Sequence, residues 1–288
     1  MKAMENKLWK MILRFQKSAI GRVIVQIAYN CGLIYIWNFF AYEKDRKHPT
    51  DEMLQSRKFF EDNKARIKKN LEMLCDRESK QTYIKCIRYR MTHDYHDRPK
   101  YNRKNQYFPK EIIKYGGGGI NFIDCGAYNG DTVRQFKKVT KNHYGKIVAF
   151  EPDHDNVQVL KKTNKNIVVI EAAVYNKNTE LFFQTGDGSS SRVSDEGIKV
   201  SARAIDSVKE CRDASFIKMD IEGSEFEALL GAKNTIFTNK PVLAICIYHS
   251  DEDMLRILEL IKSWELGYKF FVRHHAQKIS ETVLYAVQ

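Results

Sequence analysis

Two short stretches of this sequence carry acids and glycines at spacings that suit a small ligand with a ribose. The first is INFIDCGAYNGDT, residues 120–132, where an apolar run ends at Asp124 and glycines follow at positions 126 and 130. Beyond it a second apolar run, KIVAF, ends at Glu151. A carboxylate about 20 residues past a glycine turn can hold both hydroxyls of a ribose. The two stretches therefore predict the nucleoside end of a doubly wound α/β domain.

The glycine spacing distinguishes between two nucleoside cofactors. Nicotinamide-binding turns have the spacing G-x-G-x-x-G, in which the second glycine admits the pyrophosphate. Here the spacing is G-x-x-x-G, with Ala127 and Tyr128 after Gly126 and no basic residue in the turn. An acid before the turn and another after it suit a cofactor with a cationic amino-acid end and a ribose. We therefore expect S-adenosylmethionine.

A second candidate site is KMDIEGSE, residues 218–225. Strand alternation puts Lys218 and Asp220 on one face, with Glu222 in the turn that follows. His249 ends another apolar run further along the chain. Ligands of parallel sheets bind at the carboxyl ends of strands, so these side chains are candidates for catalysis.

The same residues also have a structural interpretation. Ser224 and Glu227 have the S-x-x-E spacing of a capping box and are expected to begin a helix. The acids before them either act in catalysis or only accept hydrogen bonds from the turn at Gly223. A histidine at a strand end is likewise either a base, with an unperturbed pKa suited to that role, or a structural residue.

Strands and helices alternate around these motifs, which is typical of a parallel sheet covered by helices. Strands are expected at 120–124, 146–150, 167–171, 216–219 and 242–247, and helices at 131–140, 153–164, from 224 and at 251–264. Two extra short strands, 180–183 and 198–202, flank a loop rich in glycine and serine. The closing runs YKFFVRHH and TVLYAVQ predict a hairpin and hence an antiparallel last strand.

The basic charge is concentrated in the N-terminal third. Residues 1–110 have a net charge of +13 and residues 111–288 a net charge of −1. This pattern favours an anionic partner such as phospholipid, acidic glycan or nucleic acid, although a solvated lysine-rich surface would look the same. Residues 50–90 predict two charged helices, with Thr50 as a cap and a break at 76–79. We therefore divide the chain into a basic helical region, 1–105, and an α/β domain, 106–288.

Residues 23–42 carry no charge, but polar residues and a glycine interrupt them. They fit a buried helix, an interfacial helix on an anionic membrane or a membrane span, and a secretory signal is not expected. Six cysteines without a paired spacing indicate a reducing cytoplasm and argue against a zinc site. We expect a cytoplasmic protein, with peripheral contact at the inner face of the membrane as one alternative.

Five motifs in a fixed order resemble the FkbM family of S-adenosylmethionine-dependent methyltransferases. They are FIDCGAYNGDT, AFEPD, EAAVYN, SSSRVS followed by ARAIDS, and KMDIEGSEFEALLGA. The resemblance covers residues 106–288. It implies a class I methyltransferase fold, which is a Rossmann-like, doubly wound and mostly parallel sheet, and transfer of a methyl group to a hydroxyl, often of a sugar.

The resemblance also assigns residues to the cofactor and to the reaction. Asp124, Gly126, Asn129 and Asp131 would line the methionine end, Glu151 would hold the ribose and Ala172 and Ala173 would lie near the adenine. Gly130, Thr132 and Pro152 are further cofactor-binding candidates. Asp220, Glu222 and His249 would face the transferable methyl group, with Lys218 as a further catalytic candidate, and the base is not singled out among them.

We therefore expect an O-methyltransferase that acts on a hydroxyl of a sugar in a polysaccharide or glycolipid precursor. One alternative is a nucleic-acid methyltransferase, which the basic N-terminal third would suit, but the α/β half is neutral and lacks the N-P-P-[YF] motif. Another is a non-catalytic module that binds S-adenosylmethionine and tethers a partner through residues 1–105. Neither nucleic acid nor a metal is expected to bind, and the acceptor and the oligomeric state are not predicted.

Overall fold

The computed structural model describes residues 49–115, 119–184, 192–194, 197–277 and 279–288. The uncharged stretch 23–42 and most of the glycine- and serine-rich loop therefore lie outside the described residues, and their interpretation stays a prediction. Within the described ranges, no helix is both long and apolar enough to span a membrane.

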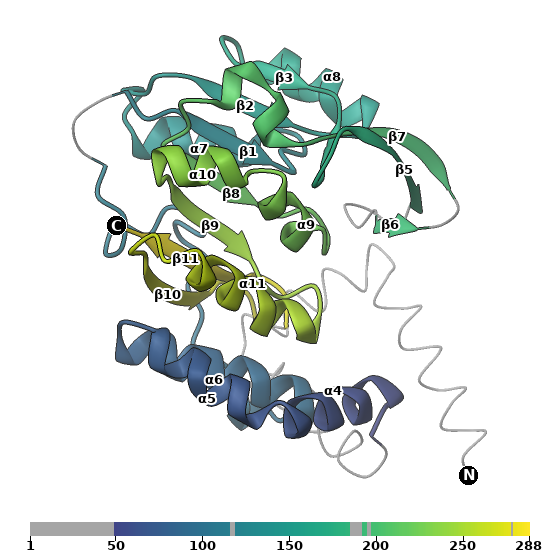
Figure 1. Cartoon of the computed structure of the whole chain (residues 1–288), viewed down its shortest axis with the longest axis vertical. Coiled ribbons are helices and arrows are strands. Elements are labelled where there is room, and N and C mark those ends of the chain that lie inside the picture. The colour runs from purple at the N-terminus through teal and green to yellow at the C-terminus, as the bar shows by residue number, and fades with distance from the viewer. Residues whose placement is uncertain (1–48, 116–118, 185–191, 195–196, 278) are drawn as a thin grey trace, which may run out of the picture.

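A seven-stranded sheet forms the centre of the molecule (Figure 1). Its strands lie in the order β10-β11-β9-β8-β1-β2-β3, and all are parallel except β11, which is antiparallel to both neighbours. The bounds are β1 Phe122–Cys125, β2 Ile147–Phe150, β3 Val168–Ile170, β8 Phe216–Met219, β9 Val242–Cys246, β10 Lys269–His274 and β11 Thr282–Val287. This arrangement confirms the expected doubly wound sheet with an antiparallel last strand.

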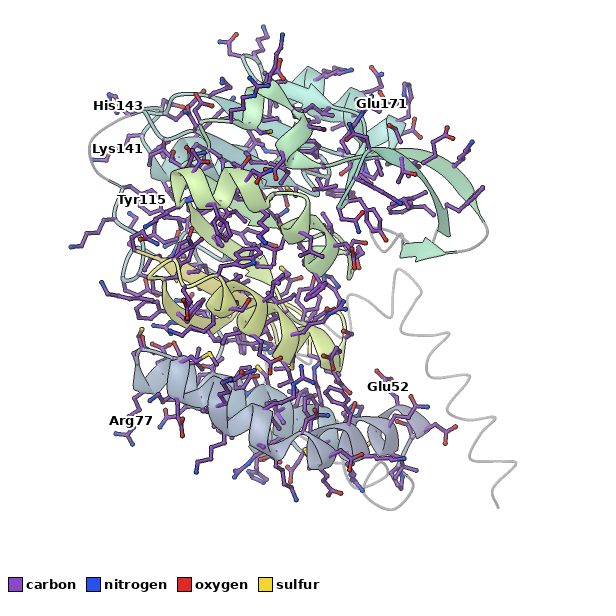
Figure 2. The ribbon with its side chains drawn as sticks, in the orientation of Figure 1. Glu52, Arg77, Tyr115, Lys141, His143 and Glu171 are labelled. Atoms are coloured by element: carbon purple, nitrogen blue, oxygen red, sulfur yellow. The ribbon has the colours of Figure 1, made fainter. Side chains whose placement is uncertain are left out.

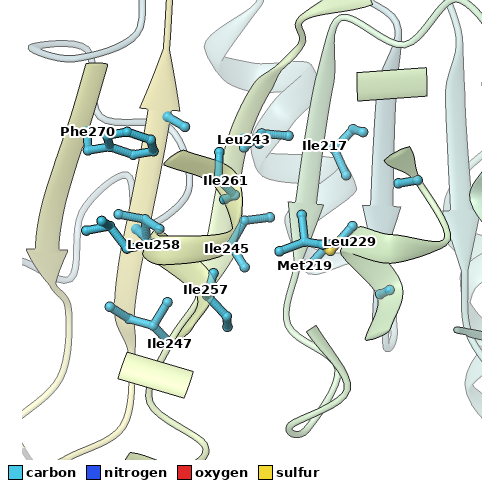
Figure 3. Packing of buried hydrophobic residues seen from close by; sticks show 14 of the residues in the cluster. Ile217, Met219, Leu229, Leu243, Ile245, Ile247, Ile257, Leu258, Ile261 and Phe270 are labelled. Atoms are coloured by element: carbon cyan, nitrogen blue, oxygen red, sulfur yellow. The ribbon is translucent and has the colours of Figure 1, made fainter. Parts of the chain in front are cut away.

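Helices cover both faces of the sheet because alternate strand residues point to opposite sides. On one face, Phe122 of β1 stacks on Phe136 of α7 with ring centroids 4.4 Å apart. On the other face, side chains of α11 pack over Leu243 and Ile245 of β9 (Figure 3). The helices are α7 Asp131–Val139, α8 His154–Thr163, α9 Glu225–Leu230, α10 Lys233–Asn239 and α11 Asp251–Ser263, and α10 was not expected from the sequence.

A second, smaller sheet extends from the carboxyl end of the main one. Its order is β4-β7-β5-β6, with bounds β4 Ala173–Val174, β5 Thr179–Gln184, β6 Arg192–Ser194 and β7 Ile198–Arg203. Strands β5 and β7 correspond to the two extra strands expected from the sequence, and they pair antiparallel. Two 3₁₀ turns, η2 Ile205–Ser207 and η3 Lys209–Cys211, return the chain to β8.

Within residues 49–115 the structure has three helices and a 3₁₀ turn, where two helices were expected over residues 50–90. They are α4 Asp51–Asp62, α5 Lys64–Met73, α6 Arg77–Thr92 and η1 Tyr95–Asp97. Thr50 caps α4 as expected, and Asp76 caps α6 by accepting from the Ser79 amide at 2.6 Å. The unexpected break lies at Asn63, whose side-chain amide donates to the carbonyl of Phe59 at 2.8 Å and thereby competes with the helical hydrogen bonds. Glu52 and Arg77 mark the two ends of this helical layer in Figure 2.

The helical layer closes the open edge of strand β10. The amide of Cys75 donates to the carbonyl of Phe270 at 2.9 Å, and the Val272 amide donates to the Ser79 hydroxyl at 2.9 Å. Phe60 and Tyr83 belong to the same buried cluster as α11 and the strands β8 and β9. The boundary near residue 105 stays a prediction, but residues on its two sides share a core.

A shared core predicts that damage to the helical layer destabilises the whole molecule. Phe60 is 1% exposed, and Phe60→Ala should lower the free energy of unfolding by about 3–5 kcal/mol through the cavity left behind. Urea unfolding of the full chain, followed by circular dichroism, should keep a single transition at a lower midpoint. Leu54→Ala, at a 47% exposed position of the same helix, is the control and should change little. Two separate transitions would show that the layer unfolds on its own.

Candidate active site

A cleft of about 440 Å³ opens at the carboxyl ends of β1, β2 and β8. Its volume lies within the range of small-molecule sites. Ten of the sequence-predicted residues line it: Gly126, Asp131, Thr132, Glu151, Pro152, Ala172, Ala173, Lys218, Asp220 and Glu222. Asp124, Asn129, Gly130 and His249 lie outside the lining.

Glu151 is held rigidly at the end of β2. One carboxylate oxygen accepts the Tyr128 amide at 2.7 Å, and the other accepts the Asp153 amide at 3.0 Å. Burial raises the pKa of Glu151, although these two amides favour the ionised form. A fixed carboxylate that borders the cleft is suited to accept hydrogen bonds from two vicinal hydroxyls.

The glycine turn serves protein packing more directly than ligand access. Gly126 and Gly130 both have φ of +80°, in the left-handed region that favours glycine. A Cβ at Gly126 would lie 2.0 Å from the carbonyl oxygen of Asp220, and one at Gly130 would lie 2.2 Å from the side chain of Asn164. Gly130 packs against α8 and its C-cap residue, and its assignment to the cofactor stays a prediction.

Asp131 and Thr132 begin α7 at the cleft, whereas Asn129 is turned away from it. The carboxylate of Asp131 accepts the amide of Thr132 at 2.8 Å. The carbonyl and side-chain oxygens of Asn129 accept from the Arg134 guanidinium at 2.8 and 3.1 Å. In this arrangement Asn129 supports the turn, and Asp131 is the acid available at this end of the cleft.

A buried ion pair joins β1 to β8 below the cleft. The Lys218 ammonium lies 3.0 Å from Asp124 and donates to the carbonyls of Cys125 and Gly126 at 3.2 and 2.8 Å. Burial raises the pKa of Asp124 to about 6, because the nearby Lys218 charge only partly offsets the loss of water. Burial alone would lower the pKa of Lys218, but Asp124 and Asp220 keep it raised. This contact with the turn carbonyls indicates a supporting role for Asp124 and Lys218.

Asp220 collects three hydrogen-bond donors at the end of β8. They are the hydroxyl of Tyr107 at 2.7 Å, the hydroxyl of Tyr248 at 3.1 Å and Nε2 of His249 at 3.2 Å. Burial would raise the pKa of Asp220, but the His249 hydrogen bond and the Lys218 charge hold it well below its usual range. Asp220 is therefore a carboxylate at neutral pH. The alternative in which it caps the turn at Gly223 is wrong, because Glu225 accepts the Gly223 amide.

His249 lies beneath Asp220 with its side chain 4% exposed. Nε2 lies 3.1 Å from Glu225, and Nδ1 lies 3.6 Å from Glu222. Burial alone would lower the pKa of His249, but hydrogen bonds to Asp220 and Glu225 raise it to about 10. At neutral pH the ring is an imidazolium, which donates protons and cannot accept one.

The expected capping box at α9 is also corrected. In the described structure the Ser224 side chain makes no cap hydrogen bond. Glu225 instead holds the turn before the helix, because its two oxygens accept the amides of Ile221 and Gly223 at 2.8 and 3.0 Å. This folding of the turn places Glu222 in the left-handed region at φ 57°, a strained conformation of the kind often found at functional sites.

Asp220, Glu225 and His249 also have atoms close enough to share a metal ion, all within 4.8 Å of one another. A metal would require a neutral histidine, whereas His249 here faces two carboxylates as a charged donor. The sequence expectation that no metal binds stays a prediction.

The far side of the cleft is built from residues that sequence reasoning did not assign. Gln106 and Tyr107 come from the segment before β1, and Glu281 comes from the connection between β10 and β11. Gln106 donates to Glu281, which has a φ of 68°. Tyr107 is 113 positions away from Asp220, so no local sequence pattern could have paired them.

The fold and cleft define a class I methyltransferase. A family model described as the Methyltransferase FkbM domain matches residues 124–270, about half of the chain, and the protein belongs to this family of S-adenosylmethionine-dependent methyltransferases. A search of curated proteins gives no match.

One solved structure agrees with this assignment. A crystal structure of methyltransferase FkbM from Methylobacillus flagellatus KT is similar with a TM-score of 0.70 and 26% identity, covering 83% of this chain and 63% of that one. This chain thus spans less than two thirds of that relative. A putative rRNA-methylase from Clostridium thermocellum has a TM-score of 0.43 and 11% identity, covering 66% of this chain and 96% of that one. Its score is too low to support an argument about function.

The residues present fit S-adenosylmethionine. Glu151 would hold the ribose, and Asp131 would lie toward the amino-acid end. The adenine would lie against an apolar wall of small residues, formed by Pro152, Ala172 and Ala173. The bound cofactor supplies a methyl group activated by a positive sulfonium.

Glu151→Ala should weaken S-adenosylmethionine binding about ten- to a hundredfold, because hydrogen bonds to a charged group are worth about 1.5–3 kcal/mol. Titration calorimetry measures this change. The matched control is Glu171→Ala, one strand further along, where an exposed carboxylate pairs with His154 at 2.8 Å outside the cleft. Glu171 lies at the far end of the molecule from the helical layer (Figure 2). Wild-type affinity in Glu151→Ala would refute the ribose assignment.

Proposed function

We propose that this protein is an O-methyltransferase that methylates a hydroxyl group of a sugar, in a polysaccharide or a glycolipid precursor. The observation that carries the proposal is Asp220. It borders the cleft as a carboxylate, and its three donors fix its orientation. A carboxylate has about four acceptor positions, so one is left for the proton of an acceptor hydroxyl.

The side chains around Asp220 suit a polar, uncharged acceptor. Glu222 and Glu281 add two carboxyl groups, and the hydroxyls of Tyr107 and Tyr248 are kept protonated because burial raises the pKa of both. Carboxylates and phenols can exchange hydrogen bonds with the hydroxyls of a sugar ring. The same acids repel phosphate, which supports a sugar over a nucleic acid as the acceptor.

In this proposal each residue has a defined task. Asp220 would accept the hydroxyl proton as the acceptor oxygen takes the methyl group and the carbon–sulfur bond of the sulfonium breaks, which leaves a neutral thioether. The two tyrosines would hold Asp220 in line with the acceptor. His249 keeps the Asp220 carboxylate ionised. Such general-base help contributes about 10²–10⁴ in rate.

The acceptor class is tested with the full-length protein, tritiated S-adenosylmethionine and fractionated cell glycans and total RNA. Label should enter a hydroxyl of the glycan fraction and resist mild base, as expected for an ether. Label in RNA would instead support the nucleic-acid alternative. Cofactor binding without transfer to any fraction would support the non-catalytic alternative.

The pH profile separates Asp220 from His249 as the base. The pKa of Asp220 is low and that of His249 is about 10, so a rate that depends on Asp220 should be flat across neutral pH and fall only as His249 loses its proton. A rate that rises through pH 10 would identify His249 as the base instead. Asp220→Asn should lower the rate by about 10²-fold or more and spare cofactor binding. The control is Asp213→Asn, at an exposed aspartate paired with Lys146.

A peripheral contact with an anionic membrane is a further part of the proposal. It is supported by the net charge of +13 in residues 1–110, which would attract acidic headgroups. A cytoplasmic location, with the acceptor presented at the inner membrane face, is consistent with this charge.

A further inference from the structure

Asp220 is held by a turn that depends on the N-terminal helices. Tyr248 and His249, two of its three partners, lie between the end of β9 and the start of α11. Arg90 of α6 reaches this turn from the helical layer and donates from Nη2 to the carbonyl oxygen of Tyr248. The turn is therefore anchored on one side to the carboxylate and on the other to α6.

A second contact fixes the start of α11 to the same layer. Nη1 of Arg90 donates to Asp251 at 2.8 Å, and the Ser56 hydroxyl of α4 donates to the other oxygen of Asp251 at 2.5 Å. Asp251 is the first residue of α11, where the helix dipole favours a negative charge. Two helices of the layer thus converge on one carboxylate next to the turn.

The burial and the planar guanidinium of Arg90 both suit its contacts with the turn and with Asp251. The residue is 8% exposed, and a buried guanidinium is costly unless it is paired. Its planar fork meets a carboxylate and a carbonyl at the same time, which the single ammonium of lysine reproduces only in part. Arg90 also lies outside residues 124–270, the range that matches the family domain.

We propose that Arg90 is a positioning residue for methyl transfer, which fixes the turn 247–250 so that Tyr248 and His249 keep Asp220 directed at the acceptor oxygen. This inference rests on the proposed function. It assigns the N-terminal helices a role in setting the rate, separate from cofactor binding. A misplacement of about 1 Å at a reacting group can cost about 10²-fold in rate.

Arg66 provides a matched control on the same layer. It belongs to α5 and pairs with Glu252 and Glu259 of α11 at 2.8 and 2.7 Å. Its removal would loosen the contact between the layer and α11 without touching the Tyr248 carbonyl. A purely structural role of the layer predicts equal effects of Arg66→Met and Arg90→Met.

The first test compares initial rates on the glycan fraction at saturating labelled cofactor. Arg90→Met should lower the rate about 10- to 100-fold while the Kd for S-adenosylmethionine stays within about twofold of wild type. Arg90→Lys should recover part of the rate. If Arg90→Met folds poorly, Arg90→Lys replaces it in the comparison with Arg66→Met. Arg66→Met should keep a rate near wild type. A wild-type rate in Arg90→Met, or an equal loss in Arg66→Met, would overturn the inference.

The second test needs no acceptor and so separates this inference from the proposed function. Histidine labelled with ¹⁵N reports the protonation of His249, which faces Asp220, Glu222 and Glu225. Its signal is assigned by its loss in His249→Gln. Arg90→Met should lower the pKa of His249 by about one unit or more as the Asp220 contact loosens, and Arg66→Met should not. An unchanged pKa in Arg90→Met overturns the positioning role, whereas failure of wild type to methylate any glycan overturns only the proposed function.

Discussion

The ammonium group of Lys218 is the contact on which the rest of the site depends. It lies at the end of β8, pairs with Asp124 of β1 and donates hydrogen bonds to the carbonyls of Cys125 and Gly126. Gly126, which follows β1, lies so close to the carbonyl oxygen of Asp220, which follows β8, that no Cβ would fit between them. The end of β1 and the end of β8 therefore fix one another's position. The same positive charge helps to keep Asp220 ionised. Removal of Lys218 would leave a buried carboxylate without its counter-charge, which is strongly destabilising.

The two halves of the cleft come from different parts of the chain. Glu151, Ala172 and Ala173 lie within the range that matches the family domain and form the side that suits the cofactor. The opposite side takes Gln106 and Glu281 from outside that range. The side that suits the cofactor therefore lies within the family range, whereas the opposite side takes part of its lining from outside that range.

Much of the fold was predictable from the sequence because its signals are local. The strands β1, β2 and β8 are buried apolar runs that end at acids, and their predicted bounds differ from the observed ones by at most two residues. The break at Asn63 was missed, because it results from a side-chain hydrogen bond inside a helical pattern. Ten of the predicted site residues line the cleft, and the roles assigned to them stay predictions. His249 has the sequence context of a base, whereas the convergence of Asp220 and Glu225 on its ring, which raises its pKa, is visible only in three dimensions.

The closure of the β10 edge also restricts how copies of this protein can associate. A strand at the edge of a sheet is a template for pairing with another chain. Here the carbonyls of Phe270 and His274 already accept the amides of Cys75 and Asn102 from the same chain. The opposite edge is β3, which is three residues long. Among the described residues, self-assembly that extends the central sheet from one copy into the next is therefore disfavoured.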